Sequence, residues 1–227
     1  MGSEIIKSQL DAYRPNFLKH GASPLGTFQN NTTTQRERHR QLLQPLLTHR
    51  PDGFSICDIG SGLCDLHQYL NDTGVAHTYT GVEIVPEMVV AAQKMHPDAR
   101  ILNVDFLDSR FSERFDFVVL SGTFNIPGIT PLTQWKQFVY QMISRMYDRA
   151  DVAISFNALT TYTTFRSKEL FYLGPGEAIS FIHDKLSRFC LINSAYPLFE
   201  LTYTVFRPEA ISLSFPQTDF DKYFSRC

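Results

Sequence analysis

The stretch from Phe54 to Asp65 constrains the fold of this chain more than any other. Its first six residues, Phe-Ser-Ile-Cys-Asp-Ile, form an apolar run with an acid near the end, and Gly-Ser-Gly follows directly. Such a run bounded by glycine is typical of a buried parallel strand. Gly60 and Gly62 allow a sharp turn and let a ligand lie close to the backbone. The stretch therefore predicts a strand, a ligand-binding turn and a helix that opens near Asp65.

Asp58, at the end of this first strand, restricts the kind of ligand. A carboxylate in this position would repel phosphate groups, so the loop is poorly suited to a pyrophosphate. It suits a ligand that is cationic or carries hydroxyl groups. The stretch therefore favours a nucleoside without phosphates.

Three later strand-like runs also end in residues that can contact a ligand. Glu83 ends the second run, where a carboxylate can accept hydrogen bonds from the vicinal hydroxyls of a ribose. Asp105 ends the third and could accept a hydrogen bond from an exocyclic amine, with Phe106 or Ile84 packing on a purine face. The fourth run ends in Ser121 and a glycine. Parallel strands would place all these groups along one edge of a sheet, where open α/β sheets bind ligands.

These motifs together resemble those of the class I S-adenosylmethionine-dependent methyltransferases. The matching segments are Asp58-x-Gly60-x-Gly62-x-x-Asp65, Gly81-Val-Glu83-Ile84, Asp105-Phe106 and the run from Phe115 to Gly122. The resemblance implies S-adenosylmethionine as cofactor and S-adenosylhomocysteine as product. It implies that the loop of Gly60, Ser61 and Gly62 holds the methionine moiety, that Glu83 holds the ribose, and that Asp105 and Phe106 hold the adenine.

A narrower resemblance involves residues 121–125 and 156–159, which look like those of a bacterial subgroup of small-molecule methyltransferases. It implies a small-molecule substrate but names none. Asp58 is expected near the cationic amino group of the methionine, and Ile84 and Ser121 are further expected cofactor contacts.

Alternating strand and helix patterns predict a doubly wound, Rossmann-like α/β sheet of seven strands. We expect strands near 54–59, 77–83, 99–104, 115–121, 150–156, 189–195 and 198–206, and helices near 4–19, 32–47, 63–72, 86–96, 132–148 and 175–187. Only Tyr196-Pro197 and their immediate neighbours separate the last two strands. That connection is too short for a helical crossover, so the last strand should be antiparallel to its neighbour. Pro45 is expected to end or kink the second helix.

The chain is expected to have three parts: an N-terminal helical lid at residues 1–50, a cofactor-binding core at 51–210, and a tail at 211–227. The lid carries its own apolar stripe and is joined to the core through a Gly-, Pro- and Asn-rich stretch. A segment of this kind can close over a cofactor. A helix pair packed permanently on the sheet is an equal alternative. If the lid closes, Tyr13, His20 and Arg36 should lie near the pocket, and Arg36 could pair with the cofactor's carboxylate.

The composition of the chain limits the kinds of binding partner that we expect. The chain has 227 residues, of which 43% are hydrophobic and 19% charged, with a formal net charge of −2. A near-neutral balance disfavours a broad nucleic-acid surface. The sequence shows neither a membrane-spanning apolar run nor a signal-peptide pattern, so a cytoplasmic protein, monomeric or homodimeric, is expected. The four cysteines show no disulfide-rich spacing, and no cluster of His, Asp and Asn indicates a divalent-cation site.

Residues that would contact the methyl acceptor are harder to identify. Asn125 follows the fourth strand, the position from which the resembled family usually addresses the acceptor, although a turn-forming asparagine is an equal reading. The expected substrate contacts are Asn125, Asn157, Tyr13, Tyr162, Arg166 and Tyr172. Asn125, Tyr172 and His20 are the candidate catalytic residues. No definite general base is nominated, because alignment of the acceptor with an activated methyl group can carry most of the catalysis.

Other functions stay open at this point. A nucleic-acid methyltransferase would rest on the basic cluster from Arg36 to Arg40, but no further basic face accompanies it. A nicotinamide-dependent oxidoreductase would favour a third glycine where Asp65 stands. A non-catalytic partner protein that binds the cofactor is also compatible with the sequence. A polar pocket rim at Asn125, Asn157 and Tyr172 would favour the enzyme over the partner protein.

Overall fold

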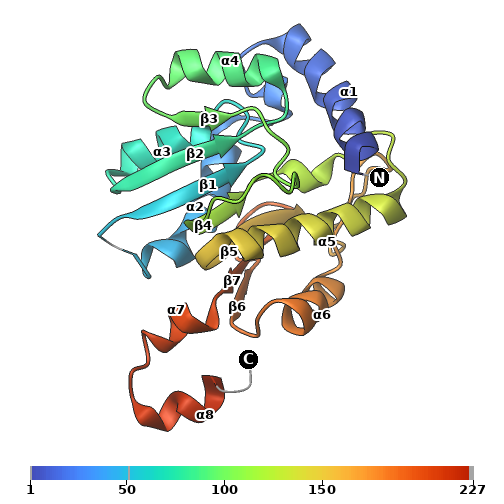
Figure 1. The fold of residues 1–227 in the computed structure, drawn as a ribbon. Coiled ribbons are helices and arrows are strands. Elements are labelled where there is room, and N and C mark those ends of the chain that lie inside the picture. The colour runs from blue at the N-terminus through green and yellow to red at the C-terminus, as the bar shows by residue number, and fades with distance from the viewer. Residues whose placement is uncertain (1, 51, 225–227) are drawn as a thin grey trace.

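The structure is a computed structural model that describes residues 2–50 and 52–224. Seven strands form one sheet (Figure 1): β1 (Phe54–Ile59), β2 (His77–Val82), β3 (Arg100–Leu102), β4 (Phe115–Leu120), β5 (Ala150–Leu159), β6 (Cys190–Asn193) and β7 (Glu200–Phe206). The main helices are α1 (Gly2–His20), α2 (Thr32–Leu47), α3 (Asp65–Thr73), α4 (Pro86–Met95), α5 (Leu132–Arg149) and α6 (Pro175–Lys185). These ranges agree closely with those expected from the sequence.

The strand order is β3-β2-β1-β4-β5-β7-β6. Strand β7 pairs antiparallel with both β5 and β6, which confirms the expected reversal of the last strand. The chain builds outward from β1 to β3 and then returns to place β4 on the other side of β1. Open α/β sheets bind ligands at such a switch point, beyond the carboxyl ends of the strands. The topology therefore locates the ligand crevice between the ends of β1 and β4.

Apolar residues cover both faces of the sheet, as a parallel sheet between two helical layers requires. On β4, Val118 and Leu120 belong to the apolar cluster under α5 and α6, whereas Phe117 and Val119 belong to the cluster under α2, α3 and α4. All four side chains are fully buried. The alternation follows from the two-residue period of a strand and sandwiches the sheet between the two sets of helices (Figure 1).

The second helix begins with an asparagine cap and ends close to a proline. The side chain of Asn31 accepts a hydrogen bond from the backbone N–H of Thr34 at 2.9 Å, as an N-cap residue does. The helix continues through Pro45 to Leu47. The expected range of the helix, to Leu47, is therefore confirmed; of the two outcomes expected at Pro45, an end of the helix or a kink, the end is not found. A proline in the final turn leaves the rest of the helix intact, since only the turn that precedes it loses a hydrogen bond.

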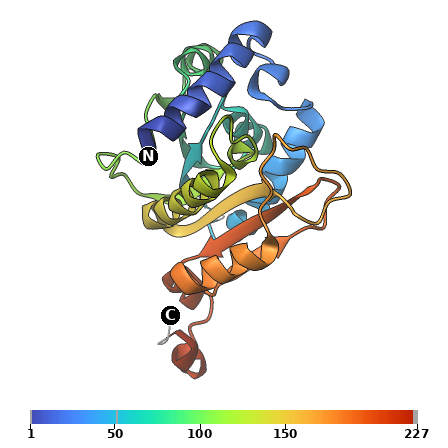
Figure 2. The same cartoon turned by 90° about the vertical axis from the view of Figure 1, so that its right-hand side faces the viewer.

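Helix α1 lies across the side of the core where the site is found, as the rotated view shows (Figure 2). It is followed by the short 3-10 helix η1 (Leu25–Thr27), whose compact turn leads into α2. Asn16 secures this turn by donating hydrogen bonds to the carbonyl oxygens of Leu25 and Gly26, at 2.7 and 3.0 Å. The turn brings residues 27–30 to the same side of the core as the strand ends.

The C-terminal part contains α7 (Pro208–Ser212), η3 (Thr218–Phe220) and α8 (Asp221–Phe224), which extend away from the sheet in Figure 1. Residues 213–224 are largely exposed. The end of the expected tail, including Cys227, lies outside the described residues. Cys57 and Cys64 are free and buried and pack as small apolar residues of the core.

Candidate functional site

The turn after β1 uses glycine where other residues would not fit. Gly60 and Gly62 have φ values of +66° and +54°, in the left-handed region that favours glycine. A Cβ atom on Gly60 would lie 2.3 Å from Oγ1 of Thr123. The backbone N–H of Gly60 donates to the carbonyl oxygen of Val82 at 2.8 Å, which ties the turn to the end of β2. The position of the turn at the switch point of the sheet is therefore fixed.

Glu83 directly follows β2 and is buried at the site. Its Oε2 accepts a hydrogen bond from the backbone N–H of Gly62 at 2.9 Å, and its Oε1 accepts one from Val85 at 2.8 Å. Burial raises the pKa of this carboxyl group, while the backbone N–H groups act in the opposite direction. The side chain thus holds the glycine turn and also lines the cavity.

Asp58 ends β1 beneath the glycine turn. Its Oδ2 accepts a hydrogen bond from the hydroxyl of Tyr79 at 2.8 Å. Burial raises the pKa of Asp58 to about 7, the Tyr79 hydrogen bond lowers it in part, and the nearby Glu83 and Asp65 carboxylates raise it further. A cationic group placed beside Asp58 would favour the ionised form. The site is therefore electrostatically suited to a positively charged ligand.

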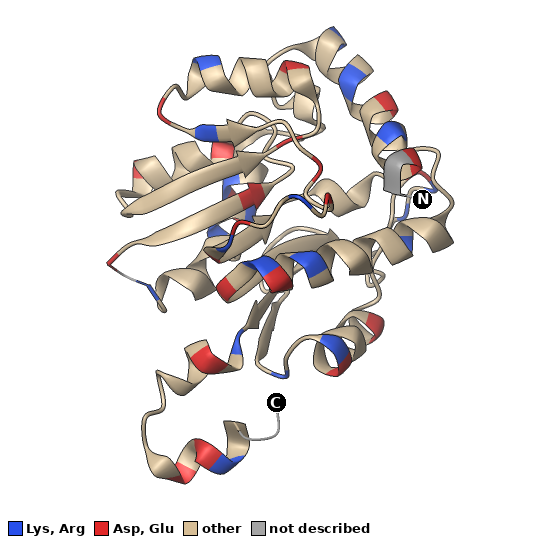
Figure 3. Ribbon diagram, in the orientation of Figure 1, with Lys and Arg blue, Asp and Glu red and all other residues tan. Residues whose placement is uncertain are grey.

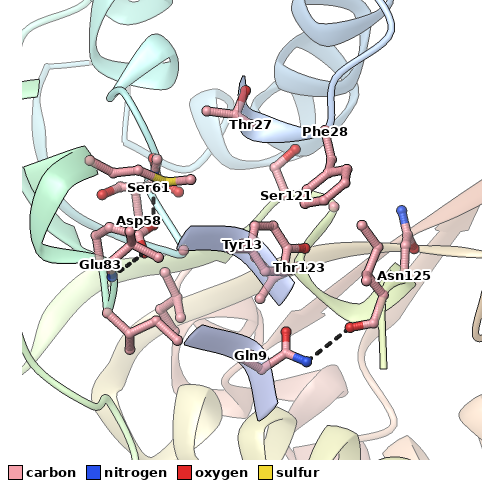
Figure 4. A pocket seen from close by; sticks show the side chains of 18 of the residues that line it. Gln9, Tyr13, Thr27, Phe28, Asp58, Ser61, Glu83, Ser121, Thr123 and Asn125 are labelled. Carbon is pink, nitrogen blue, oxygen red and sulfur yellow. Dashed lines mark hydrogen bonds between the residues drawn. The ribbon is translucent and has the colours of Figure 1, made fainter. Parts of the chain in front are cut away.

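A cavity of about 370 Å³ opens at these strand ends, within the size range of small-molecule sites. Figure 4 shows Asp58, Ser61 and Glu83 gathered on one side, and Tyr13, Thr123 and Asn125 on the other. The predicted residues that line the cavity are Asp58, Gly60, Ser61, Gly62, Glu83, Ile84, Asp105, Phe106, Ser121, Asn125 and Tyr13. All but one of the expected cofactor contacts are therefore brought together at a single site.

Asp105 and Phe106 follow β3 and line the cavity beyond the end of that strand. Oδ1 of Asp105 accepts a hydrogen bond from the backbone N–H of Leu107 at 2.9 Å, which fixes the side chain. Burial raises the pKa of Asp105 above its ordinary value. Phe106 is 2% exposed and packs in the core against Phe111, with ring centroids 5.0 Å apart. This end offers one carboxyl group and apolar packing to a flat ligand.

Helix α1 supplies a wall of the cavity with Ile6, Gln9 and Tyr13, which lie on one face at helical spacing. Nε2 of Gln9 donates to the carbonyl oxygen of Ile126 at 3.0 Å, shown as a dashed line in Figure 4. The ring of Tyr13 makes an edge contact with Phe28, with centroids 5.1 Å apart. Gln9 and Phe28 were missed in the sequence; the three-and-four spacing on α1 was the signal that could have identified Gln9.

Helix α2 contributes Gln35, Arg38 and His39. The sequence indicated Arg38 and His39 only as part of the basic cluster of a nucleic-acid methyltransferase, and it did not indicate Gln35. Nε2 of Gln35 donates to Asp65 at 2.8 Å. Nε of Arg38 donates to both carboxylate oxygens of Glu200, at 2.8 and 3.1 Å, and Nη1 donates to Gln29. This ion pair is almost completely buried, with the two side chains 12% and 1% exposed.

Six predicted residues do not line the cavity: Arg36, His20, Asn157, Tyr162, Arg166 and Tyr172. Arg36 instead pairs with Asp72 at 2.7 Å and lies over the ring of Tyr69. His20 is exposed at the end of α1. The expectation that both approach the pocket from the lid is therefore not met by this structure, because their positions on the helices direct them elsewhere.

Asn157 lies beneath the site, fully buried. Its Oδ1 accepts a hydrogen bond from the backbone N–H of Gly122 at 2.7 Å, and its Nδ2 lies 3.5 Å from Glu200. Asn157 therefore holds the backbone just after β4 and does not line the cavity. Asn125 does line the cavity, but its Oδ1 also receives the backbone N–H of Leu159 at 3.4 Å.

The segment from Thr160 to Tyr172 is held mainly by its own contacts. The hydroxyl of Tyr172 accepts a hydrogen bond from the backbone N–H of Ser167 at 2.9 Å, and Arg166 lies over the Tyr172 ring. Tyr162 is 80% exposed. Leu170 is the member of this segment that lines the cavity. The predicted polar rim is thus formed by Asn125 without Asn157 or Tyr172.

Comparisons with known proteins agree with this geometry. Residues 56–147 match a family model described as a methyltransferase domain. Rv1506c of Mycobacterium tuberculosis (strain ATCC 25618 / H37Rv), itself named only as a candidate methyltransferase, is 30% identical over 162 residues, which cover 70% of this chain and 96% of that protein. The chain belongs to the class I S-adenosylmethionine-dependent methyltransferases. Its cofactor is S-adenosylmethionine, as the motifs at the strand ends imply.

Solved structures share the fold of this methyltransferase. The N-methyltransferase NodS from Bradyrhizobium japonicum WM9, in complex with S-adenosyl-l-homocysteine, aligns with a TM-score of 0.65 and 16% identity over 88% of this chain and 99% of NodS. The DhpI-SAM-HEP complex aligns with a TM-score of 0.62 and 17% identity, over 90% of this chain and 98% of that one. At these identities the likeness establishes the fold.

The residues of the methyltransferase fit its cofactor. Oγ of Ser61, Oγ of Ser121 and Nδ1 of His39 are buried beside the cavity without a hydrogen-bond partner among the described residues. Buried polar atoms are normally satisfied, so three such atoms around one cavity indicate that a polar ligand belongs there. The glycine turn and the buried acids supply the remaining groups that the cofactor requires.

Within residues 2–50 and 52–224, no group of three or more His, Cys, Asp and Glu side chains is arranged to hold a metal ion. None of the helices in the same ranges is both long and apolar enough to cross a membrane.

Proposed function

We propose that this methyltransferase transfers the methyl group of S-adenosylmethionine to a small-molecule acceptor. The observation that carries the proposal is the cavity of about 370 Å³ at the strand ends, one wall of which is formed by α1. A cavity of this size admits a cofactor and a small acceptor, but it has no room for a folded macromolecule. The names of two structural relatives support a small acceptor: one acts on magnesium protoporphyrin IX and another on a sugar.

Each cofactor group is assigned to the residues that face it. Glu83 would accept hydrogen bonds from the ribose hydroxyls, and Asp105 and Phe106 would hold the adenine. The turn from Gly60 to Gly62 would hold the methionine moiety, with Asp58 near its amino group. Support comes from the placement of all these residues on one cavity at the carboxyl ends of β1, β2 and β3.

The protein would act mainly by positioning. When bound, S-adenosylmethionine would supply an activated methyl group: the acceptor's lone pair forms the new bond, the pair of the broken C–S bond stays on sulfur, and a proton carried by the acceptor is released to solvent. Helix α1 excludes water, and the cavity walls align the acceptor; alignment of this kind can lower a barrier by ~7–11 kcal/mol. Burial and the nearby Glu83 raise the pKa of Tyr13, so its hydroxyl stays protonated and serves as a hydrogen-bond donor. No general base is assigned.

The N-terminal segment is proposed to be a lid. The proposed parts are the lid at residues 1–50, the core at 51–210 and a tail at 211–227. Support comes from the small number of polar contacts between α1 and the core. Gln9 donates to the carbonyl oxygen of Ile126, the Ser8 hydroxyl accepts from the backbone N–H of Ile129, and Arg14 forms an exposed ion pair with Glu87. Contacts of this kind can break and re-form as a ligand enters.

A nucleic-acid acceptor is the second candidate. Figure 3 shows Lys and Arg mixed with Asp and Glu along α1 and α5, and the basic residues Arg36 and Arg40 already pair with Asp72 and Glu37. This distribution favours the small-molecule acceptor, because nucleic-acid binding needs clustered positive charge. Buried free thiols at Cys57 and Cys64 are in keeping with a reducing compartment such as the cytoplasm.

Calorimetry with the purified protein tests the proposal. We expect micromolar affinity for S-adenosylmethionine and S-adenosylhomocysteine, and little or none for NAD. A non-catalytic partner protein would bind the cofactor equally well, so the second step is an assay of S-adenosylhomocysteine release with small-molecule acceptors and with RNA. Turnover with RNA alone would overturn the small-molecule assignment. Comparable affinity for NAD would overturn the cofactor.

A further inference from the structure

The cavity has two halves of different electrostatic character. The acidic residues that line it are Asp58, Asp65, Glu83 and Asp105, and all four come from the ends of β1, β2 and β3 or from the start of α3. That half is occupied by the cofactor under the proposed function. The remaining walls come from α1, residues 27–30, α2, the end of β4, α5, and Leu159 and Leu170. The acceptor must lie against these walls.

The acceptor half carries no ionised side chain from α1, residues 27–30, the end of β4 or the end of β5. Its apolar walls are Ile6, Phe28, Ile126, Leu159 and Leu170. Its polar side chains are the amides of Gln9, Gln29, Asn30 and Asn125 and the hydroxyls of Tyr13, Thr27, Ser121 and Thr123. Burial keeps the Tyr13 hydroxyl protonated. All of these groups are neutral at physiological pH.

The ionisable groups that approach this half from α2 are also without net charge. The guanidinium of Arg38 is compensated by the Glu200 carboxylate at 2.8 Å. Burial, together with the positive charges of Arg38 and Arg36, lowers the pKa of His39 to about 3, so its imidazole is neutral. A charged acceptor in this half would lose its water without gaining a counter-charge from these walls, which disfavours its binding.

Hydrogen-bonding capacity remains where an acceptor could use it. Because Nε2 of Gln9 donates to Ile126, its Oε1 is left to accept. Because Oδ1 of Asn125 accepts from Leu159, its Nδ2 is left to donate. The Tyr13 hydroxyl makes no hydrogen bond to any residue in the described ranges and faces the cavity (Figure 4). Together they present two donors and one acceptor to a single polar atom or a small polar group.

We propose that the methyl acceptor is an uncharged molecule with an apolar body, such as a phenol, an alcohol or a neutral amide, and that Tyr13, Gln9 and Asn125 hold its polar end. The inference rests on the proposed function, since it takes the acidic half of the cavity for the cofactor. It assigns the acceptor by its charge and by the groups that it presents to the protein.

Three probes that share one aromatic body test the proposal: 2-phenylethanol, phenylacetate and 2-phenylethylamine. Each is titrated by calorimetry or ligand-observed NMR into protein saturated with S-adenosylhomocysteine at pH 7.5. We expect the alcohol to bind at least tenfold more tightly than either ion. Equal or tighter binding of an ion would overturn the proposal, as would the failure of all three probes to bind at millimolar concentration.

Two variants sharpen the test. Tyr13→Phe removes only a hydroxyl and should weaken the alcohol about five- to tenfold while the protein still binds S-adenosylhomocysteine. The matched control is Tyr140→Phe on α5, whose ring stacks on Phe181 at 4.3 Å outside the cavity. It should leave the affinity for the alcohol unchanged. Equal effects of the two substitutions would refute the assignment of Tyr13.

The titration of S-adenosylhomocysteine alone separates the two hypotheses. If the wild-type protein does not bind it, the proposed function fails. If S-adenosylhomocysteine binds and the probes do not follow the expected order, only the assignment of the acceptor class fails. A charge-neutralising substitution adds a second readout. Glu200→Gln leaves the Arg38 charge uncompensated and should raise the affinity for phenylacetate at least fivefold. Unchanged discrimination in folded Glu200→Gln would show that charge at this wall does not select the acceptor.

Discussion

The Glu83 carboxylate accepts a hydrogen bond from the backbone N–H of Gly62 at 2.9 Å, so the end of β2 directly holds the glycine turn after β1. The same carboxylate lines the cavity. One side chain therefore shapes the turn and faces the cofactor. Its removal affects both, and the two effects can be measured separately.

Glu83→Ala should weaken the binding of S-adenosylhomocysteine by ~1–3 kcal/mol, because the ribose hydroxyls and the Gly62 N–H lose their acceptor. Calorimetry measures the change in affinity, and chemical denaturation measures stability in parallel. Glu113→Ala is the control, because Glu113 is exposed and pairs with Arg100 outside the cavity. An unchanged dissociation constant in folded Glu83→Ala would show that another group holds the ribose.

Cofactor affinity should depend on pH through Asp58, whose pKa burial raises to about 7. The positive charges of S-adenosylmethionine favour the ionised carboxylate, so binding below pH 7 releases a proton. Affinity should therefore fall as the pH decreases through 7, approaching tenfold for each pH unit when one proton is released. Calorimetry from pH 6 to 8 measures this dependence, and Asp58→Asn should flatten it. The same slope in the variant would assign the proton to another group.

Asp58 should make the stability of the free protein fall as the pH rises, whereas it makes the cofactor affinity rise. Because the folded carboxyl group has a raised pKa, its contribution to stability is complete below the unfolded value of 3.8 and is lost as the pH rises to about 7. Asp58→Asn should therefore raise the free energy of unfolding at pH 8, by up to ~4 kcal/mol, since one pKa unit corresponds to about 1.4 kcal/mol. Denaturation at pH 5 and pH 8 measures the difference. A variant less stable than wild type at pH 8 would contradict the expectation.

Two arginines on α2 should behave differently when replaced by alanine. Arg38→Ala leaves the Glu200 carboxylate buried and unpaired, which should destabilise the protein by ~3–5 kcal/mol. Arg36 forms an exposed pair with Asp72, worth at most ~1 kcal/mol, and lies outside the cavity. Arg36→Ala should therefore change neither stability nor cofactor affinity appreciably. A marked loss of S-adenosylhomocysteine binding in Arg36→Ala would restore the expectation that this residue meets the cofactor's carboxylate.

The glycine turn should not tolerate a side chain. Gly60→Ala places an alanine at a φ of +66° and brings its Cβ 2.3 Å from Oγ1 of Thr123. The left-handed conformation alone costs ~1–2 kcal/mol, and the contact adds to it. The control is Gly176→Ala in α6, where a Cβ meets nothing within 4 Å and should be neutral or stabilising by up to ~1 kcal/mol. Denaturation curves that place the two variants at equal stability would contradict this account.

The lid hypothesis predicts a change in hydrogen exchange. Amides between about Tyr13 and Arg40 should gain protection when S-adenosylhomocysteine binds, because α1 and residues 27–30 would close over it. Helix α6, which does not line the cavity, should keep the same exchange rates and serves as the internal control. High protection of residues 13–40 in both states would instead identify a fixed structural cap, the alternative to the lid.

Much of the fold and the cofactor side of the site could be predicted from local sequence. The run from Phe54 to Gly62 carries its own strand period, turn residues and acid, and Glu83 and Asp105 follow strands that are also readable locally. Parallel strands place their carboxyl ends at one edge, so these separate signals converge without further information. The acceptor side offered no such rule, since its residues come from α1, from the short 3-10 helix η2 (Thr123–Asn125) and from loops.

The sequence by itself therefore determined the order of the elements, the direction of the last strand and the acids that face the cofactor. Only the tertiary structure decided which side chains of the helices and loops reach the cavity. Arg36 and Arg38 illustrate the reason: positions two apart on a helix point to nearly opposite faces, and the sequence alone does not say which face of α2 turns toward the cavity. The packing of α2 against β5, β7 and α3 sets that orientation and brings Arg38 to Glu200, 162 residues away in the chain.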